Sequence, residues 1–337
     1  VCNYDSPNAL FLNESATGGD GRLAFREAAA EFGLALVDAC LMPSFCDYDN
    51  DGDLDCWIVT NGLVRAEGRP AQPPFYKDET TGQVKVKPEF ARYYDIVQTG
   101  ASTYTMDEIG RPDYLLRNDR GKFVDVSKQA GIEATGFGLS ATWWDYNEDG
   151  LMDIYVCNDY IGADQLFKNK GDGTFVDVIT ETVNEIPWFS MGSDAGDINN
   201  DGRLDFIALD MAPTTHYKSK MAMGDMGSSR WSVENVKPRQ LMRNVCFLNT
   251  GTSRFLETAQ LSGIASTDWS WAAKLADFDS DGRVDLFVSN GMTRDFNNSD
   301  FHFDKSHLIG KTQWDHFENT PTMPEQNLAF KNLDGLK

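Results

Sequence analysis

The sequence predicts an all-β protein, a β-propeller built from four-stranded blades. Three observations lead to this fold class. A nine-residue acidic pattern occurs four times, a short strand rich in β-branched and aromatic residues follows each copy, and the same order of strands and turns recurs along the chain. The clearest spacing, from Asp145 to Asp197, is 52 residues. That length accommodates about four short strands and their turns, as in one propeller blade.

The acidic pattern reads Asp-x-Asp/Asn-x-Asp-Gly-x-x-Asp, and we name its four copies loop 1 to loop 4 in chain order. Oxygen ligands at positions 1, 3, 5 and 9, with a glycine at position 6 for the sharp turn, suit Ca²⁺ in a short loop. The residue at position 7 of each loop is counted among the predicted ligands as well. We therefore expect about four Ca²⁺ sites. The predicted ligands are Asp47, Asp49, Asp51, Asp53 and Asp55; Asp145, Asn147, Asp149, Leu151 and Asp153; Asp197, Asn199, Asp201, Arg203 and Asp205; and Asp277, Asp279, Asp281, Arg283 and Asp285.

The loops differ from EF-hands in how they end. An EF-hand closes with a glutamate at position 12 and lies between helices, whereas here position 12 is Ile58, Val156, Ala208 or Val288, each within a predicted strand. We therefore expect β-hairpin connections. Solvent-facing Asx turns without metal would explain a single copy, because Asp, Asn and Gly dominate turns. Four copies with the same exit strand favour a metal site.

Two further kinds of strand complete each repeat. One ends in asparagine, and after a glycine-rich turn the next begins with phenylalanine. The first kind covers residues 10–13, 115–118, 166–169, 247–249 and 329–332, and the second covers 25–27, 123–126, 175–178 and 255–258. Five blade-like units result. Because residues 1–3 repeat the phase of residues 156–158 and the last unit stops shortly after Asn332, we expect one propeller over residues 1–337, incomplete at both ends.

With these repeats, the chain resembles the FG-GAP/VCBS repeat family of calcium-binding β-propellers. The stretch Thr267–Asp279, together with Ser289–Asp295 and Asp210–Pro213, is similar to bacterial ASPIC/UnbV-type secreted propellers, although no terminal ASPIC/UnbV segment is present. The resemblance implies a secreted or surface-displayed protein with structural Ca²⁺ and a binding role. It also implies that the five units are part of a ring of about seven or eight blades.

The net charge indicates which partners to expect, and the calcium loops indicate the compartment. Asp and Glu number 52 against 30 Lys and Arg, a net charge of -22, which disfavours binding to nucleic acid or anionic membranes. No apolar run is long enough to span a membrane. Open calcium loops suit the millimolar Ca²⁺ outside the cytosol, so we expect a secreted, cell-surface or periplasmic protein. Most of the six cysteines fit apolar strand positions, and a bridge among Cys40, Cys46 and Cys56 stays open.

Three insertions, at residues 62–113, 211–245 and 291–327, leave the repeat from the strand end distal to the loops. We therefore expect them on one face of the propeller, opposite the calcium loops, where scaffolds commonly carry binding sites. The second insertion is basic, which would suit an acidic protein or an anionic glycan. The alternative is that its cations balance nearby acids and its apolar residues pack the insertion down. The candidate ligand-binding residues are Lys218, Lys220, Arg230, Trp231 and Arg239.

No enzyme motif stands out. The four histidines lie in no metalloprotease pattern, and nucleophile elbows, phosphate loops and dinucleotide fingerprints are absent from the sequence. Asp300, His302, Asp304 and His307 form the best cluster for a transition metal, although ordinary surface polarity explains them better, because no third placed ligand completes a site. We therefore expect a binding module acting in adhesion, protein assembly or glycan recognition, rather than an enzyme. The alternative is a catalytic propeller acting on an extracellular polysaccharide or another polymer.

Overall fold

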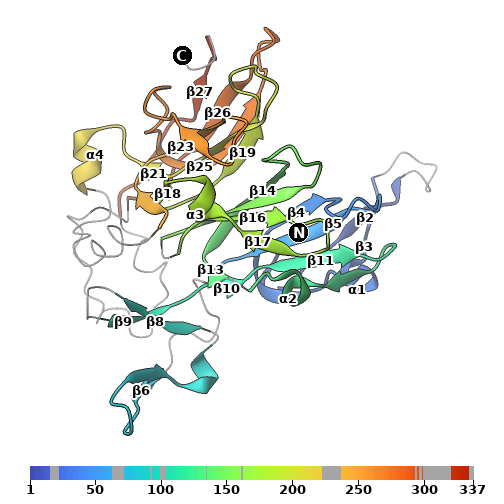
Figure 1. Ribbon diagram of the computed structural model, residues 1–337, viewed down its shortest axis with the longest axis vertical. Helices are drawn as coiled ribbons and strands as arrows, with labels where there is room; N and C mark the ends of the chain where they lie inside the picture. Colours follow the sequence, from blue (N-terminus) through green and yellow to red (C-terminus); the bar gives the residue numbers. More distant parts are fainter. Residues whose placement is uncertain are drawn as a thin grey trace. The chain divides into compact units, whose positions relative to one another are not determined.

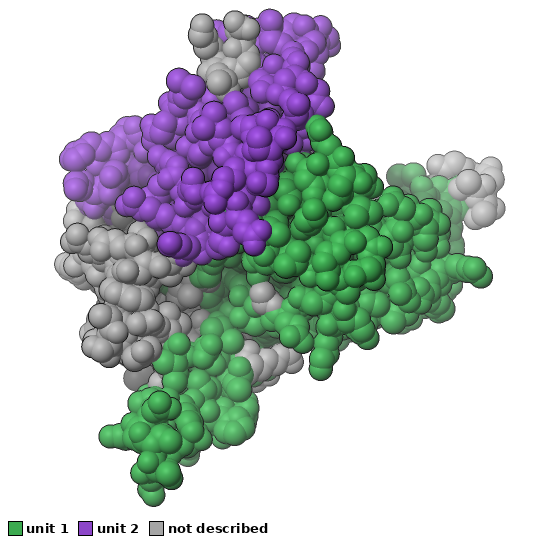
Figure 2. Space-filling view, viewed as in Figure 1, with its two compact units in different colours: residues 1–179 green, residues 180–337 purple. Residues whose placement is uncertain are grey.

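The computed structural model describes residues 1–15, 23–62, 72–91, 93–98, 104–133, 135–160, 162–221, 237–292, 294–295, 298 and 320–333. The chain forms two compact units, Val1–Ile179 and Thr180–Lys337, which are coloured separately in Figure 2. Both units consist mainly of antiparallel sheets, and their helices are short (Figure 1).

Unit 1, residues 1–179, contains two blade-like sheets. One has the strand order β1 (Tyr4–Pro7), β4 (Val37–Cys46), β5 (Asp55–Thr60), β11 (Tyr114–Asn118) and β12 (Phe123–Asp125). The other has the order β14 (Gly138–Trp144), β15 (Asp153–Asn158), β16 (Gln165–Asn169) and β17 (Phe175–Asp177). Smaller elements are the pairs β2 (Phe11–Asn13) with β3 (Phe25–Glu27) and β10 (Arg111–Pro112) with β13 (Thr135–Gly136), and helices α1 (Ala29–Phe32) and α2 (Ser127–Ala130). The first insertion adds β6 (Phe75–Lys77), β7 (Val84–Val86), the 3-10 helix η2 (Pro88–Phe90), β8 (Tyr94–Gln98) and β9 (Tyr104–Glu108).

Unit 2, residues 180–337, repeats this plan. One sheet has the order β19 (Ser193–Gly196), β20 (Asp205–Ala208), β23 (Val245–Asn249) and β24 (Phe255–Glu257). The next has the order β21 (Met211–Ala212), β25 (Asp268–Ala276), β26 (Asp285–Asn290) and β27 (Leu328–Phe330). The remaining elements are the parallel pair β18 (Glu185–Pro187) and β22 (Arg239–Leu241), helix α4 (His216–Met221), and α3 (Ile179–Thr182) at the boundary of the two residue ranges.

The predicted fold class is confirmed. The structure is nearly all β, and its curled four-stranded antiparallel sheets are propeller-type blades. The strands predicted after each loop are β5, β15, β20 and β26, and each pairs antiparallel with the strand that enters the loop. The loops therefore close β-hairpins, as expected. Strands β2, β11, β16 and β23 end in asparagine as predicted, whereas β27 ends at Phe330, two residues before Asn332. Strands β3, β12, β17 and β24 begin with phenylalanine as predicted.

Two features of the blades do not follow from the repeat. Strands β1 and β21 are additional strands, which pair with the first strand of the following blade through Tyr4↔Ala39 and Met211↔Trp269. In addition, five residues before each strand-ending asparagine lies an Asn or Asp whose Oδ1 accepts from a backbone N–H earlier in the chain. These acceptors are Asn8, Asp113, Asp164, Asn244 and Asn327, at 2.8 to 2.9 Å. The donors Thr60, Asn158 and Asn290 end strands β5, β15 and β26, whereas Asp210 lies two residues after β20 and Asn3 lies just before β1. Each blade is therefore fastened at the end away from its loop.

The core of unit 1 is aromatic. Tyr48 and Trp57 come from the first blade and meet Trp143, Phe167 and Phe175 of the second. Ring centroids lie 5.4 Å apart for Trp57 and Phe167, and 5.6 Å apart for Tyr48 and Phe175. Trp143 therefore packs between the two blades. Tyr48 is position 2 of loop 1, so the loop itself contributes to this core.

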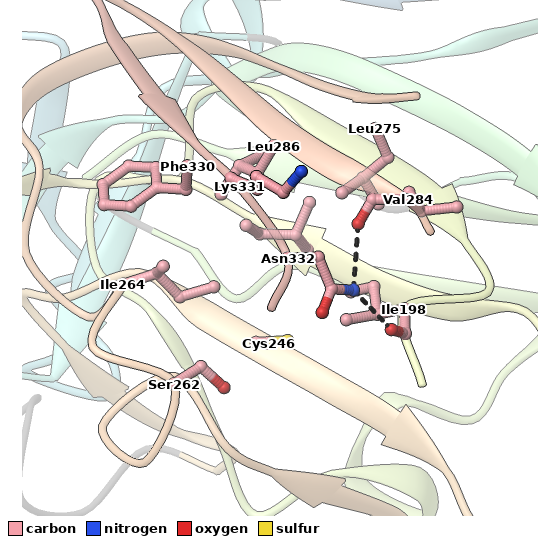
Figure 3. A pocket seen from close by; sticks show the side chains of 11 residues that line it. Ile198, Cys246, Ser262, Ile264, Leu275, Val284, Leu286, Phe330, Lys331 and Asn332 are labelled. Carbon is pink, nitrogen blue, oxygen red and sulfur yellow. Dashed lines mark hydrogen bonds between the residues drawn. The ribbon is translucent and has the colours of Figure 1, made fainter. Parts of the chain in front are cut away.

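The corresponding core of unit 2 contains a cavity of about 90 Å³ (Figure 3). By repeat position, Ile198 replaces Tyr48, and Leu275 replaces Trp143. Cys246 and Ser262 stand where unit 1 has Leu115 and Ala130, and they line the cavity with Ile198 and Leu275. Among the described residues, no strand pairs with the outer edge of β27, whereas β17 covers that edge of β16. These smaller side chains leave space that aromatic rings fill in unit 1.

Candidate calcium loops

The first aspartate of each loop shapes the turn. In loop 1, the carboxylate of Asp47 accepts from the backbone N–H of Asp51 at 3.1 Å and of Gly52 at 3.0 Å. The same two bonds recur in the other three loops. The glycine at position 6 has φ between 83° and 93° in all four copies, in the left-handed region that favours glycine. This carboxylate therefore orders the turn while keeping its oxygens inside the loop.

Position 4 also adopts a left-handed conformation, which the sequence analysis missed. Asn50, Glu148, Asn200 and Ser280 have φ between 57° and 62°. Asparagine tolerates this region better than most residues, so its presence in two of the four loops was the available signal. Glu148 and Ser280 hold the same conformation without that preference, which indicates that the loop geometry is imposed by the whole repeat.

The last aspartate anchors each loop to the third strand of its blade. Asp153 is fully buried, and its two oxygens accept from the backbone N–H of Tyr146 at 3.3 Å and of Asn169 at 2.8 Å. The Asn169 side chain in turn donates to the carbonyl of Met152 at 3.2 Å. Equivalent bonds fix Asp55, Asp205 and Asp285 through Asn118, Asn249 and Asn332. The strand-ending asparagine therefore connects each loop to its sheet.

Burial makes the anchoring carboxylates of loops 1, 2 and 3 difficult to ionise. Desolvation raises the pKa of Asp55 and of Asp205 to about 6, and that of Asp153 to about 7, although backbone N–H donors oppose the shift. A bound cation would favour the charged form. The loops thus contain a buried acid whose charge a metal ion would compensate.

The remaining predicted side chains converge to different degrees. Carboxylate oxygens of Asp47, Asp49 and Asp55 lie within 4.8 Å of one another, and so do those of Asp277, Asp279 and Asp285. In loops 2 and 3, position 3 is an asparagine, whose amide donates to the position 5 carboxylate: Asn147 to Asp149 at 2.9 Å and Asn199 to Asp201 at 3.2 Å. At position 7, the side chains of Arg203 and Arg283 pair with Asp201 and Asp281. Only the backbone carbonyl of these two arginines could ligate a cation.

The chemistry of this donor set fits Ca²⁺. The pattern offers carboxylate, amide and carbonyl oxygens, and no nitrogen or sulfur ligand belongs to it. Three acids converge in loop 1 and three in loop 4, and all four oxygen-rich loops close a hairpin at one end of a blade.

The predicted ligand-binding residues of the second insertion have mixed surroundings. Lys218 pairs with Asp268 and Glu325, both at 2.8 Å, and so links helix α4 to the start of β25. This contact matches the alternative in which insertion cations balance nearby acids. Lys220 and Arg239 are exposed. Arg230 and Trp231 lie outside the described residues.

Other predicted groups can also be placed. Cys40, Cys46 and Cys56 are free thiols, so the disulfide left open by the sequence is not formed in this structure. Asp300, His302, Asp304 and His307, the candidate transition-metal cluster, lie outside the described residues. Trp271 is 41 % exposed and stacks against Trp269. Within the described part of the chain, no helix has the length and apolarity needed to cross a membrane.

Fold and loops together define a propeller-type protein with candidate calcium hairpins. Residues 145–208, which include loops 2 and 3, match the FG-GAP-like repeat. The chain is 23 % identical to cartilage acidic protein 1 of Homo sapiens, over 86 % of this chain and 53 % of that protein. It is 25 % identical to the same protein of Xenopus tropicalis, over 86 % of this chain and 55 % of the relative. The chain thus spans about half the length of these relatives.

A solved structure of an Agrocybe aegerita lectin, described as recognising non-reducing terminal N-acetylglucosamine, is also similar. It is 15 % identical, with a TM-score of 0.34 over 86 % of this chain and 76 % of the lectin. A superposition of that quality supports no conclusion about the ligand of this chain. The FG-GAP-like repeat expected from the sequence is therefore confirmed for residues 145–208, and the narrower ASPIC/UnbV resemblance stays a prediction.

Proposed function

We propose that this chain is a calcium-stabilised, extracytoplasmic propeller module whose role is to bind another protein or a glycan. The observation that carries the calcium part is the repeated anchoring of the loops. In all four, a buried carboxylate at position 9 bonds both to its own loop and to the third strand of the blade. Four copies of one oxygen-rich arrangement favour a shared structural ion.

The ion would be held by side chains at positions 1, 3, 5 and 9 and by the carbonyl at position 7. When bound, Ca²⁺ supplies positive charge to a cluster of three or four acids. The chain's own residues do the rest. The position 1 carboxylate orders the turn. The position 9 carboxylate fixes the loop to the third strand by accepting from the backbone N–H of Asn118, Asn169, Asn249 or Asn332. Loop closure and sheet pairing are therefore coupled.

Calcium content tests this part of the proposal. After dialysis against millimolar Ca²⁺ and removal of free ion, elemental analysis should find about four Ca²⁺ per chain. A variant with Asp145→Ala and Asp197→Ala should hold about two, because position 1 orders the turn in loops 2 and 3. The control, Asp119→Ala, removes an acid that pairs with Arg117 outside the loops and should leave the content unchanged. Equal calcium in wild type and double variant would contradict the assignment.

The binding part rests on the insertions that the scaffold displays. Helix α4 and strand β22 of the second insertion expose Lys220 and Arg239 in a chain of net charge -22. Exposed cations on an acidic protein suit an acidic protein surface or an anionic glycan. Nucleic acid is not the proposed partner, because the overall charge opposes it, and we propose no catalytic activity.

Retention on immobilised heparin tests this surface directly. The double change Lys220→Glu with Arg239→Glu should lower the salt concentration needed for elution, because two attractive charges become repulsive. Lys128→Glu with Lys170→Glu alters net charge equally on unit 1 and serves as the control. If both double variants elute together, the second insertion has no specific role in anion binding.

A further inference from the structure

The four loops share their turn geometry but differ in the cations that contact their carboxylates. None of the described residues places a cation within ion-pair distance of a carboxylate of loop 1. Loop 2 has Lys168 at 3.4 Å from Asp149, and loop 3 has Arg203 at 3.3 Å from Asp201. Loop 4 has two cations: Arg283 contacts Asp281 at 2.8 Å, and Lys331 contacts both Asp279 and Asp281.

Lys331 has a defined position in the repeat. It directly precedes Asn332, the asparagine whose N–H donates to Asp285 at 2.9 Å. The corresponding residues in the other loop-bearing blades are Arg117, Lys168 and Leu248. Arg117 pairs with Asp119 at 2.8 Å, outside loop 1, and Leu248 carries no charge. Lys331 is therefore the member of this series that contacts two predicted ligands of its loop.

We propose that Lys331 is a resident counter-ion of loop 4, and that it makes loop 4 the weakest and loop 1 the strongest of the four calcium sites. This inference rests on the proposed calcium function. The ammonium of Lys331 contacts the carboxylates at positions 3 and 5, which a calcium ion also needs. An entering ion must displace it, and both ion pairs are lost.

Displacement does not remove the charge from the site. Asn332 fixes the backbone next to Lys331 by bonding to Asp285, so the ammonium stays within one side-chain length of the loop. A unit charge held at about 5 Å from a divalent ion weakens binding about fivefold, even with the dielectric constant and salt of water. Lys168 contacts only the position 5 carboxylate at the longer distance of 3.4 Å, so loop 2 should be affected less.

The graded arrangement has a structural consequence. Loop 1 closes the hairpin whose Tyr48 enters the aromatic core of unit 1, and it should stay filled as Ca²⁺ falls. Loop 4 closes the hairpin of β25 and β26, beside the cavity of unit 2, and should empty first. In the emptied loop, Lys331 and Arg283 offset part of the repulsion among the carboxylates. The last blade would therefore tolerate loss of calcium better than the first.

Calorimetric titration of the calcium-depleted full chain with Ca²⁺ tests the proposal. Compared with the wild-type titration, Asp277→Ala should remove the weakest binding step, and Asp47→Ala should remove the tightest. Lys331→Met should tighten the weakest step about tenfold, because both the competing contacts and the residual charge disappear. Lys331→Arg keeps the charge and should leave that step nearly unchanged. Lys274→Met, which removes an exposed lysine paired with Asp194 at 3.3 Å, controls for net charge.

The possible results distinguish a failure of the calcium function from a failure of the role of Lys331. Absence of calcium binding in wild type would overturn both the proposed function and this inference. Four steps in wild type with no tightening in Lys331→Met would overturn the role of Lys331 alone. Equal tightening in Lys331→Met and Lys274→Met would show a general charge effect and would likewise overturn it.

Discussion

The cores of the two units are built at the same repeat positions but with different side chains. In unit 1, the aromatic side chains of Tyr48, Trp57, Trp143 and Phe175 pack against one another. In unit 2, Ile198, Ile207 and Leu275 stand at the repeat positions of Tyr48, Trp57 and Trp143, and the core contains a cavity of about 90 Å³. The loops and their anchors are nevertheless the same in both units. The repeat therefore constrains the loop and its bond to the third strand more tightly than the packing beneath it.

Among changes that test this comparison, replacing an aromatic core residue should have the largest effect on the free energy of unfolding. Trp57→Ala should lower the free energy of unfolding by about 3–5 kcal/mol, because it leaves a large void in close-packed surroundings. It also removes the indole N–H that donates to buried Asp113 at 2.9 Å. The matched change in unit 2, Ile207→Ala, should cost about 2–3 kcal/mol, since a smaller side chain is lost. Urea unfolding followed by circular dichroism gives both values, and equal costs would break the comparison.

The second effect is a dependence of the unfolding free energy on pH, which Asp113 should cause in unit 1 and the equivalent Asn244 should not cause in unit 2. Asp113 and Asn244 occupy the same place in their blades. Asp113 accepts from the N–H of Thr60, the last residue of β5, and Asn244 accepts from the N–H of Asp210, two residues beyond β20. Burial raises the pKa of Asp113 to about 7, above its value in the unfolded chain. The folded state therefore binds a proton that the unfolded state has released, and this contribution to stability falls as pH rises from about 4 to 7.

Replacing Asp113 by the residue of unit 2 tests that contribution. Asp113→Asn should remove a slope of up to about 1.4 kcal/mol per pH unit from the unfolding free energy. It should also cost about 1 kcal/mol at low pH, because an amide N–H would face the indole N–H of Trp57. Urea unfolding at several pH values measures both quantities. An unchanged slope would show that Asp113 is ionised in the folded state throughout this range.

The smallest effect concerns the cavity itself. Cys246→Leu introduces the side chain that unit 1 has at Leu115 and should raise the free energy of unfolding by about 1 kcal/mol, because it adds buried apolar area without displacing a neighbour. The reverse change, Leu115→Cys, should destabilise unit 1, because it opens a void in a core that is filled. A destabilising Cys246→Leu would mean that the cavity cannot accept the larger side chain.

The sequence predicts much of this arrangement because the decisive signals are local. The acidic pattern, the alternation of apolar residues and the Asn and Phe markers each lie within a few residues, so loops and strands could be placed before any tertiary contact was known. The pairing of β1 with β4 and of β21 with β25 depends on distant partners, and no local pattern specifies it. The Asn or Asp that fastens the other end of each blade was visible at constant spacing, but its partner was not.

The residues predicted to bind a ligand in the second insertion show the same limit, because contacts with distant segments leave no local sequence pattern. Lys218 was singled out by charge, yet its partners Asp268 and Glu325 come from β25 and from the third insertion, far along the chain. In unit 1, Arg111 likewise contacts Asp38 and Asp5 from two other strands. Charge counts within one insertion could not reveal these pairs, because each joins segments brought together only by the fold.

The central claim is that calcium in the four loops holds the blades together. Thermal unfolding in excess Ca²⁺ and then in EGTA, with bound metal counted by elemental analysis on the same sample, tests it most directly. We predict about four Ca²⁺ per chain and a large fall in the unfolding temperature on chelation, because each emptied loop leaves mutually repelling carboxylates next to a buried acid. Little bound metal and an unchanged unfolding temperature would contradict the account.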